Sequence, residues 1–191
     1  MVKKVFMKDI SLHILDIVEN SVKAGAGTVT LEFSWNGTVF SLCISDDGPG
    51  FPDSIKDNPA DPFKTTRKER KVGLGLPLLK DSAEQTGGRL RIGTGEKGGV
   101  KIEADFDMGH IDSKPIGDLA DLMTTCIAAW PQMNWIVKLG DEGEILNTAD
   151  IRSELGEIDL GNREIRNFLS KQLNADFKPL NDWVDRITPS I

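Results

Sequence analysis

The sequence predicts an α/β domain followed by a small α+β part. Over the first 108 residues, segments with the apolar spacing of a helix are interleaved with segments that alternate as strands do. A change of composition at 109–115 indicates a boundary, and further helical and strand-like segments follow it. At 191 residues the chain is long enough to bury the core of one domain with an appendage.

Helices and strands of the first part are predicted from their apolar spacing. Leu15, Val18 and Val22 fall on one side of a helix, and Gly25 ends it. The next segment alternates as a half-buried strand does, and Asn36-Gly37 is typical of a tight hairpin. The expected elements, in chain order, are a helix at 11–24, strands at 28–35 and 38–45, a helix at 75–85, and strands at 89–93 and 100–106.

Residues 51–72 are rich in proline, aspartate and lysine, which predicts a long loop with one short helical piece. Loops of this length in a compact domain are commonly functional lids. After the boundary, apolar spacing predicts an amphipathic helix from Leu119 to Trp130, which Pro131 ends. The remaining expected elements are a hairpin of strands at 134–139 and 144–147, and helices at 149–155 and 163–173.

Composition narrows the classes of function. The net charge of −7 and the absence of a basic face argue against nucleic-acid binding. The sequence has no run of about 18 apolar residues, so no membrane span is predicted. The basic N-terminus lacks the apolar core of a signal peptide. The two cysteines, Cys43 and Cys126, lie in apolar runs, so we expect both to be reduced and buried. These features indicate a protein of the reducing cytoplasm.

Four short boxes in the first part are its most informative feature. In chain order they read Asp16-Ile-Val-Glu19-Asn20-Ser21, Asp46-Asp47-Gly48-Pro49-Gly50-Phe51, Asp61-Pro62-Phe63-Lys64-Thr65-Thr66-Arg67 and Gly73-Leu74-Gly75-Leu76. This set resembles the nucleotide pocket of the GHKL superfamily, which includes gyrase-type ATPases, MutL-type repair proteins and histidine kinases. The residues of the last two boxes are most similar to those of histidine kinases.

The resemblance covers roughly residues 10–108. It implies the Bergerat fold, a two-layer α/β sandwich in which a mixed sheet packs on helices and ATP lies between the helices and a lid. Residues 1–108 are then a histidine-kinase-like ATP-binding domain, 109–115 a linker, and 116–191 a small α+β module. The role of that module is open between partner recognition or dimerisation and a packing extension that stabilises the sheet.

The first box puts three polar residues on one stripe of a helix. Asp16 and Asn20 are four residues apart and project from the same face, and Lys23 extends the stripe. On its own such a stripe would be the solvated side of an amphipathic helix. By resemblance Asn20 coordinates Mg²⁺, which accepts carbonyl oxygen, and Lys23 contacts the nucleotide. Asp16 takes the position of the water-activating acid, where its short carboxylate predicts slow hydrolysis.

The second box supplies the adenine contact by resemblance. Asp46 would accept a hydrogen bond from the adenine amino group, which guanine lacks at that position. Gly48 and Gly50 allow the backbone to turn tightly beside the ligand. Without the other boxes, an ordinary Asp-Gly turn would explain this segment equally well. The superfamily's final box carries a threonine on the last strand, whereas this sequence has Gly99-Val100, which removes a hydroxyl from the adenine site.

The remaining boxes are assigned to the lid and the phosphates. Lid residues Thr65, Thr66 and Arg67 belong to a basic run, which could also be a solvated face. Backbone N–H groups at a helix start form a ready anion site, which suits the β- and γ-phosphates. By resemblance the residues of that helix start are Gly73, Leu74, Gly75 and Leu76.

The sequence leaves three hypotheses of function. No upstream phosphoacceptor helix precedes the first box, so a self-contained sensor kinase is not expected. The chain is predicted to bind ATP and Mg²⁺ and to act on an unidentified protein partner, as anti-sigma serine kinases do. The alternatives are a nucleotide-gated binding module without useful catalysis and a slow Mg²⁺-dependent ATPase. A homodimer is left open.

Overall fold

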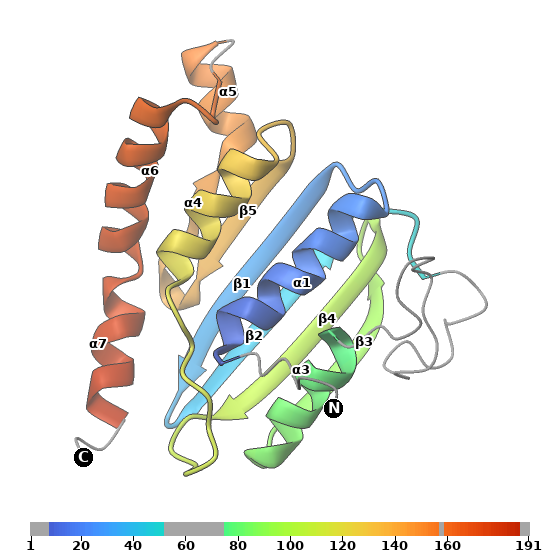
Figure 1. Cartoon of the computed structure of the whole chain (residues 1–191), viewed down its shortest axis with the longest axis vertical. Helices are drawn as coiled ribbons and strands as arrows, with labels where there is room; N and C mark the ends of the chain where they lie inside the picture. The colour runs from blue at the N-terminus through green and yellow to red at the C-terminus, as the bar shows by residue number, and fades with distance from the viewer. Residues whose placement is uncertain (1–7, 52–74, 157–158, 188–191) are drawn as a thin grey trace, which may run out of the picture.

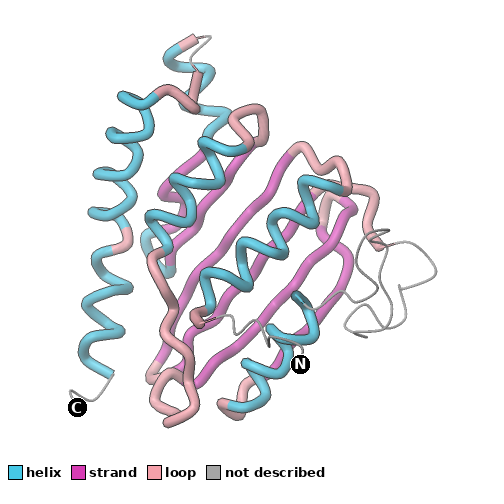
Figure 2. Tube along the Cα trace, in the orientation of Figure 1, coloured by secondary structure: helices cyan, strands magenta, loops and turns pink. Residues whose placement is uncertain are grey.

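Six strands form one mixed sheet with helices layered on one face (Figures 1 and 2). The computed structural model describes residues 8–51, 75–156 and 159–187. The strands are β1 Thr28–Asn36, β2 Val39–Asp46, β3 Arg89–Gly95, β4 Gly98–Asp107, β5 Asn134–Leu139 and β6 Gly143–Asn147. The helices are α1 Ile10–Lys23, α3 Gly75–Gln85, α4 Leu119–Ala129, α5 Thr148–Leu155, α6 Arg163–Asp176 and α7 Lys178–Ile187, with a 3-10 turn η1 at Gly140–Glu142.

The strand order is β3-β4-β2-β1-β5-β6. β1 and β5 run parallel, and the other neighbouring pairs are antiparallel. Helices α1, α3 and α4 lie over the same face of this sheet (Figure 1). The predicted mixed sheet in a two-layer α/β sandwich is therefore confirmed.

Alternation along the strands separates a buried face from an open one. In β1, Val29, Leu31 and Phe33 are buried, whereas Glu32 and Ser34 point to the other face. The residues paired with them in β2 and β4 follow the same pattern, so the helix-covered side of the sheet is apolar. The opposite side carries hydroxyls and charges and needs no covering layer.

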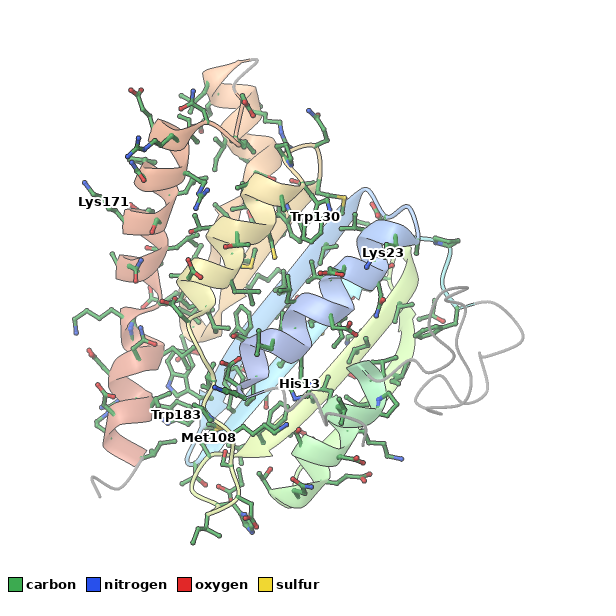
Figure 3. All side chains as sticks on the ribbon, in the orientation of Figure 1. His13, Lys23, Met108, Trp130, Lys171 and Trp183 are labelled. Carbon is green, nitrogen blue, oxygen red and sulfur yellow. The ribbon has the colours of Figure 1, made fainter. Side chains whose placement is uncertain are left out.

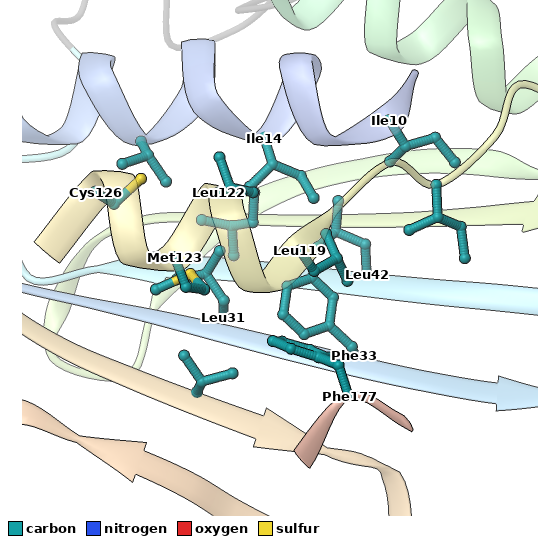
Figure 4. Packing of buried hydrophobic residues seen from close by; sticks show 14 of the residues in the cluster. Ile10, Ile14, Leu31, Phe33, Leu42, Leu119, Leu122, Met123, Cys126 and Phe177 are labelled. Atoms are coloured by element: carbon teal, nitrogen blue, oxygen red, sulfur yellow. The ribbon is translucent and has the colours of Figure 1, made fainter. Parts of the chain in front are cut away.

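The core lies between the sheet and the helices (Figure 4). Ile14 from α1 and Met123 from α4 meet Leu31 and Phe33 of β1 and Leu42 of β2 in one cluster of buried residues. α1 contributes most of its apolar side to this cluster, and it also contacts α3.

Residues after 115 build onto the same sheet and core. β5 pairs with β1 along its length, with Thr28 opposite Asn134 and Phe33 opposite Leu139. The ring of Phe177, just after α6, meets the ring of Phe33 edge-on with 5.7 Å between centroids. The C-terminal part thus covers the strand edge that β1 would otherwise leave unpaired.

Helix α7 was not predicted from the sequence. The last helix expected from the sequence ends at 173, and Pro179 is the second residue of α7. Proline is tolerated in the first turn of a helix, where its missing N–H leaves no hydrogen bond unmade. Trp183 of α7 is buried, and its indole N–H donates to Gly37 O in the β1–β2 turn at 3.0 Å.

Among the described residues, no helix has the length and apolar content needed to cross a membrane.

Candidate nucleotide site

Asp46, the last residue of β2, has its carboxylate fixed from three directions. Oδ2 accepts from the Ser21 hydroxyl of α1 at 2.7 Å. Oδ1 accepts from the backbone N–H groups of Gly48 at 3.0 Å and Val100 at 3.2 Å. A carboxylate offers about four acceptor positions. The described residues fill three of them, which leaves one on Oδ2 for a donor such as an amino group.

Val100 contributes to this site through its backbone rather than its side chain. The sequence suggested that a valine in place of threonine weakens the adenine contact. The structure shows that the Val100 N–H orients Asp46 whatever side chain it carries. The contact depends on the preceding Gly99, whose backbone lies against Asp46.

Glycines bring the β3–β4 turn against the loop after β2. A Cβ on Gly99 would lie 2.1 Å from Asp46 O and 2.5 Å from its Oδ1, distances that no real Cβ atom shows. Gly99 also has φ +67°, a left-handed conformation that favours glycine. A Cβ on Gly50, at φ +78°, would lie 3.5 Å from Gly99 O. The two turns therefore pack backbone to backbone beside the Asp46 carboxylate.

Asp16 and Asn20 lie on the side of α1 that faces α3. Asn20 Nδ2 donates to Asp16 Oδ2 at 3.5 Å, so the two side chains lie next to each other on one face of α1, as predicted from their spacing. A Cβ on Gly75, the first described residue of α3, would lie 1.8 Å from Asp16 Oδ2. Because Cβ bonds tilt toward the N-terminus of a helix, the Asp16 carboxylate lies at the N-terminal side of the first turn of α3.

The contact between Asp16 and Gly75 has a measurable consequence. Gly75→Ala is expected to push the Asp16 carboxylate aside, because that carboxylate is flexible and the helix backbone is not. In a double-mutant cycle with Asp16→Ala, the two changes should destabilise less than their sum by about 1 kcal/mol. Urea denaturation of the four proteins measures this coupling. Strictly additive free energies of unfolding would show that the two residues do not meet.

The other predicted site residues either contact different neighbours or lie outside the described residues. Lys23 forms an exposed ion pair with Glu19 one turn earlier at 2.6 Å, a kind of pair that stabilises little. Figure 3 shows Lys23 and His13 near opposite ends of α1. Leu76 packs partly buried against the core. The remaining predicted residues, Thr65, Thr66, Arg67, Gly73 and Leu74, lie outside the described residues.

Two residues of this site were not singled out by the sequence. Ser21 was noted only as a small residue, and Asp47 only as part of the second box. Asp47 Oδ1 accepts from the N–H groups of Gly27 at 2.7 Å and Thr28 at 2.8 Å. The doubled aspartate before Gly48 was the available signal, since two adjacent carboxylates at a strand end need two separate sets of donors.

His13 is a buried, neutral histidine between α1, α3 and the segment before α4. Lys114 Nζ lies 3.1 Å from its Nε2, and Ser82 Oγ lies 3.4 Å from the same atom. Lysine can only donate, so Nε2 accepts and the proton lies on Nδ1. Burial, helped by Lys114 and opposed by Asp16 and Asp9, lowers the pKa of His13 from 6.5 to about 4.

This lowered pKa makes stability depend on pH. The unfolded chain protonates His13 near pH 6.5 and the folded chain only near pH 4, so stability falls as the pH drops through this window. Between pH 7.5 and pH 5, His13 should remove about 2 kcal/mol from the free energy of unfolding. Urea denaturation of the protein and of His13→Gln at both pH values measures the difference. Equal pH dependence of the two proteins would contradict a neutral buried histidine.

Comparison with known proteins agrees with this geometry. A family model described as histidine kinase-, DNA gyrase B-, and HSP90-like ATPase matches residues 8–110. The sensor histidine kinase RegB of Cereibacter sphaeroides is 29% identical over 87 residues, which are 40% of this chain and 19% of RegB. Sensor protein RstB of Escherichia coli K12 is 26% identical over 104 residues, 51% of this chain and 24% of RstB. The chain thus spans less than a quarter of the length of either relative.

A solved structure, that of the mycobacterial sensor histidine kinase MprB, aligns with 49% of this chain and 66% of its own at 24% identity and a TM-score of 0.41. The family match itself runs from the start of α1 to just past β4, and it includes Asp16, Asn20, Asp46 and Gly75. The chain therefore belongs to the histidine kinase-, DNA gyrase B- and HSP90-like ATPases, and residues 8–110 form its ATP-binding domain.

Proposed function

We propose that this chain is a Mg²⁺-dependent ATP-binding protein that acts in trans on a separate protein, by transferring the γ-phosphoryl group to it. The observation that carries the nucleotide part is the Asp46 carboxylate. It is oriented by Ser21, Gly48 and Val100 and keeps one acceptor position beside two glycine turns. The transfer step rests on the likeness to sensor histidine kinases.

Asp46 selects adenine by hydrogen-bond direction. Its carboxylate can only accept, so it matches the exocyclic amino group of adenine and leaves the oxo group of guanine facing an acceptor. A hydrogen bond to a charged group contributes about 1.5–3 kcal/mol, and an unmatched buried acceptor costs a similar amount. Discrimination between the two bases of about tenfold or more follows.

Asp16 is the candidate general base. Its carboxylate lies at the N-terminal side of α3, where backbone N–H groups favour an anion, and beside Asn20. A proton taken from an attacking hydroxyl or water would go to Asp16 Oδ1 or Oδ2. The side chain is one methylene shorter than glutamate, so we expect turnover in the absence of a partner to be slow.

The side-chain oxygen of Asn20 fits magnesium. Mg²⁺ prefers oxygen ligands and is usually held by one or two protein groups together with substrate phosphates. Asn20 would supply a carboxamide oxygen from the face of α1 that also carries Asp16, which is kept as the general base. When bound, the ion neutralises charge on the β- and γ-phosphates.

The second part of the chain is proposed to support the nucleotide-binding part. We keep 1–108 as the nucleotide-binding domain, 109–115 as the link and 116–191 as the module that closes the β1 edge through β5, which pairs with β1. Both cysteines are free thiols, which supports a reducing cytoplasm as the place of work. Cys126 is buried as expected, whereas the expectation was wrong for Cys43, which is only half-buried.

The test is incubation of the pure protein with γ-labelled ATP and Mg²⁺, with and without an extract of the source cells. Label on a protein only when extract is present supports transfer to a partner. Release of labelled phosphate without extract supports the slow ATPase instead, and tight binding with neither product supports a nucleotide-gated module. Asp46→Asn, run in parallel, should abolish each signal. Equal signals from this variant would contradict the site.

A further inference from the structure

Asp47 uses its side chain to hold backbone rather than ligand. Its Oδ1 accepts from Gly27 N at 2.7 Å and Thr28 N at 2.8 Å, and its own N–H donates to Thr28 O at 3.3 Å. Burial raises the pKa of Asp47, but these hydrogen bonds outweigh burial and lower the pKa overall. The ionised carboxylate therefore joins the turn between α1 and β1 to the end of β2 by hydrogen bonds.

That turn also determines where Ser21 lies. Ala26 N donates to Ser21 O at 3.1 Å, which ties the turn to the last turn of α1. Ser21 Oγ in turn donates to Asp46 Oδ2 at 2.7 Å. Asp47 is therefore connected to its neighbour Asp46 by a chain of hydrogen bonds that runs through the turn and Ser21.

The same turn is held from its other side by the C-terminal part. Gly27 O accepts from Asn134 N at the start of β5, at 2.9 Å. The side chain of Asn134 is itself fixed, since its Oδ1 accepts from Ala149 N at 2.8 Å and Thr148 Oγ1 at 3.2 Å. Asn134 lies outside the matched residues 8–110. The backbone of Gly27 is thus held on both sides: its N–H donates to Asp47, and its C=O accepts from Asn134 of β5.

We propose that Asp47 is a positioning residue for adenine recognition, which acts through Gly27, Thr28 and Ser21 on the direction of the Asp46 carboxylate, with β5 as the fixed support of the turn. This inference rests on the proposed binding of adenine by Asp46. Substitution of Asp47 should therefore change the selectivity between adenine and guanine, and not only the stability of the fold.

The experiment compares the dissociation constants of ATP and GTP for the full chain and four variants by calorimetry. Asp47→Ala removes the acceptor, and Asp47→Asn keeps an Oδ1 that can accept both N–H groups. Asp47→Glu keeps the charge but displaces the oxygen, which covers the case in which the alanine variant does not fold. Asp107→Ala is the matched control, because Asp107 Oδ1 accepts from Gly109 N at 3.0 Å at the opposite end of the sheet.

We expect Asp47→Ala and Asp47→Glu to lower the preference for ATP over GTP about fivefold or more, and Asp47→Asn to retain most of it. Asp107→Ala should lower the melting temperature without changing the preference. An equal loss of both nucleotides in Asp47→Ala, an unchanged preference, or a loss as large in Asp47→Asn would overturn the positioning role. A wild-type protein that binds neither nucleotide, or both equally, would instead remove the proposed function on which this role rests.

Discussion

Asp46→Asn is expected to weaken ATP binding at least about tenfold, because the substitution removes the charge from the proposed hydrogen bond to adenine. The asparagine amide would also meet three donors, from Ser21, Gly48 and Val100, with a side chain that has only one acceptor oxygen. If the asparagine oxygen keeps the Oδ1 position, its NH₂ group replaces Oδ2. The Ser21 hydroxyl must then turn to accept, and the open acceptor position is lost. Calorimetric titration with ATP measures the loss.

A matched control lies on the open face of the sheet. Asp105 accepts from Ser41 Oγ at 2.7 Å and from Arg89 Nε at 2.9 Å, so Asp105→Asn makes the same chemical change in a similar polar network away from Asp46. This variant should bind ATP as the wild type does. ATP affinity near the wild-type value in a folded Asp46→Asn protein would contradict the adenine assignment.

Gly99→Ala is expected to destabilise the protein by about 3 kcal/mol or more and to abolish ATP binding. A left-handed φ costs a non-glycine residue about 1–2 kcal/mol. The new Cβ would also lie 2.1 Å from the backbone oxygen of Asp46, so either the β3–β4 turn or the end of β2 must move. Since that movement displaces the Asp46 carboxylate, stability and ATP affinity fall together.

The neighbouring glycine separates the two causes. Gly98 has a similar φ of +88°, but its Cβ would meet only Gly48 O at 4.0 Å. Gly98→Ala should therefore show the cost of the conformation without the collision, about 1–2 kcal/mol, and should still bind ATP. Urea denaturation and calorimetry on both variants provide the comparison. Equal destabilisation by the two substitutions would show that the close approach at Gly99 has no energetic consequence.

Local elements were predictable because each carries its own periodicity. The helix predicted at 75–85 is α3 with the same bounds, and the hairpin predicted at Asn36-Gly37 joins β1 and β2. The helix predicted at 11–24 differs from α1 by one residue at each end. In these segments burial on one face and hydrogen bonding within a few residues determine the structure, and both are visible in a short window of sequence.

The pairing of β5 with β1 could not be predicted in this way. About a hundred residues separate the two strands, and a parallel pair has no turn whose residues announce it. The segment 134–139 was correctly predicted as a strand, but its place in the sheet depends on which edge is unpaired. The edge that β5 takes belongs to β1, whose other side is already paired with β2.

For the site, the sequence singled out the residues proposed to face a ligand, but not those that orient them. Asp16, Asn20 and Asp46 were predicted, and the structure puts Asp16 beside Asn20 and leaves Asp46 an acceptor position. Ser21 and Asp47 act through hydrogen bonds to residues up to 25 positions away, and only Asp47 has a local signal, the doubled aspartate before Gly48. Long-range partners of this kind appear only once the fold is known.

Calorimetric titration of the wild-type protein with ATP and with GTP, each in the presence and absence of Mg²⁺, tests the central claim most directly. The site around Asp46, Asp16 and Asn20 predicts saturable binding of one ATP per chain, tighter with Mg²⁺ than without it, and at least about tenfold weaker binding of GTP. Absence of ATP binding, or equal affinity for the two nucleotides, would contradict the assignment of Asp46 as the adenine acceptor.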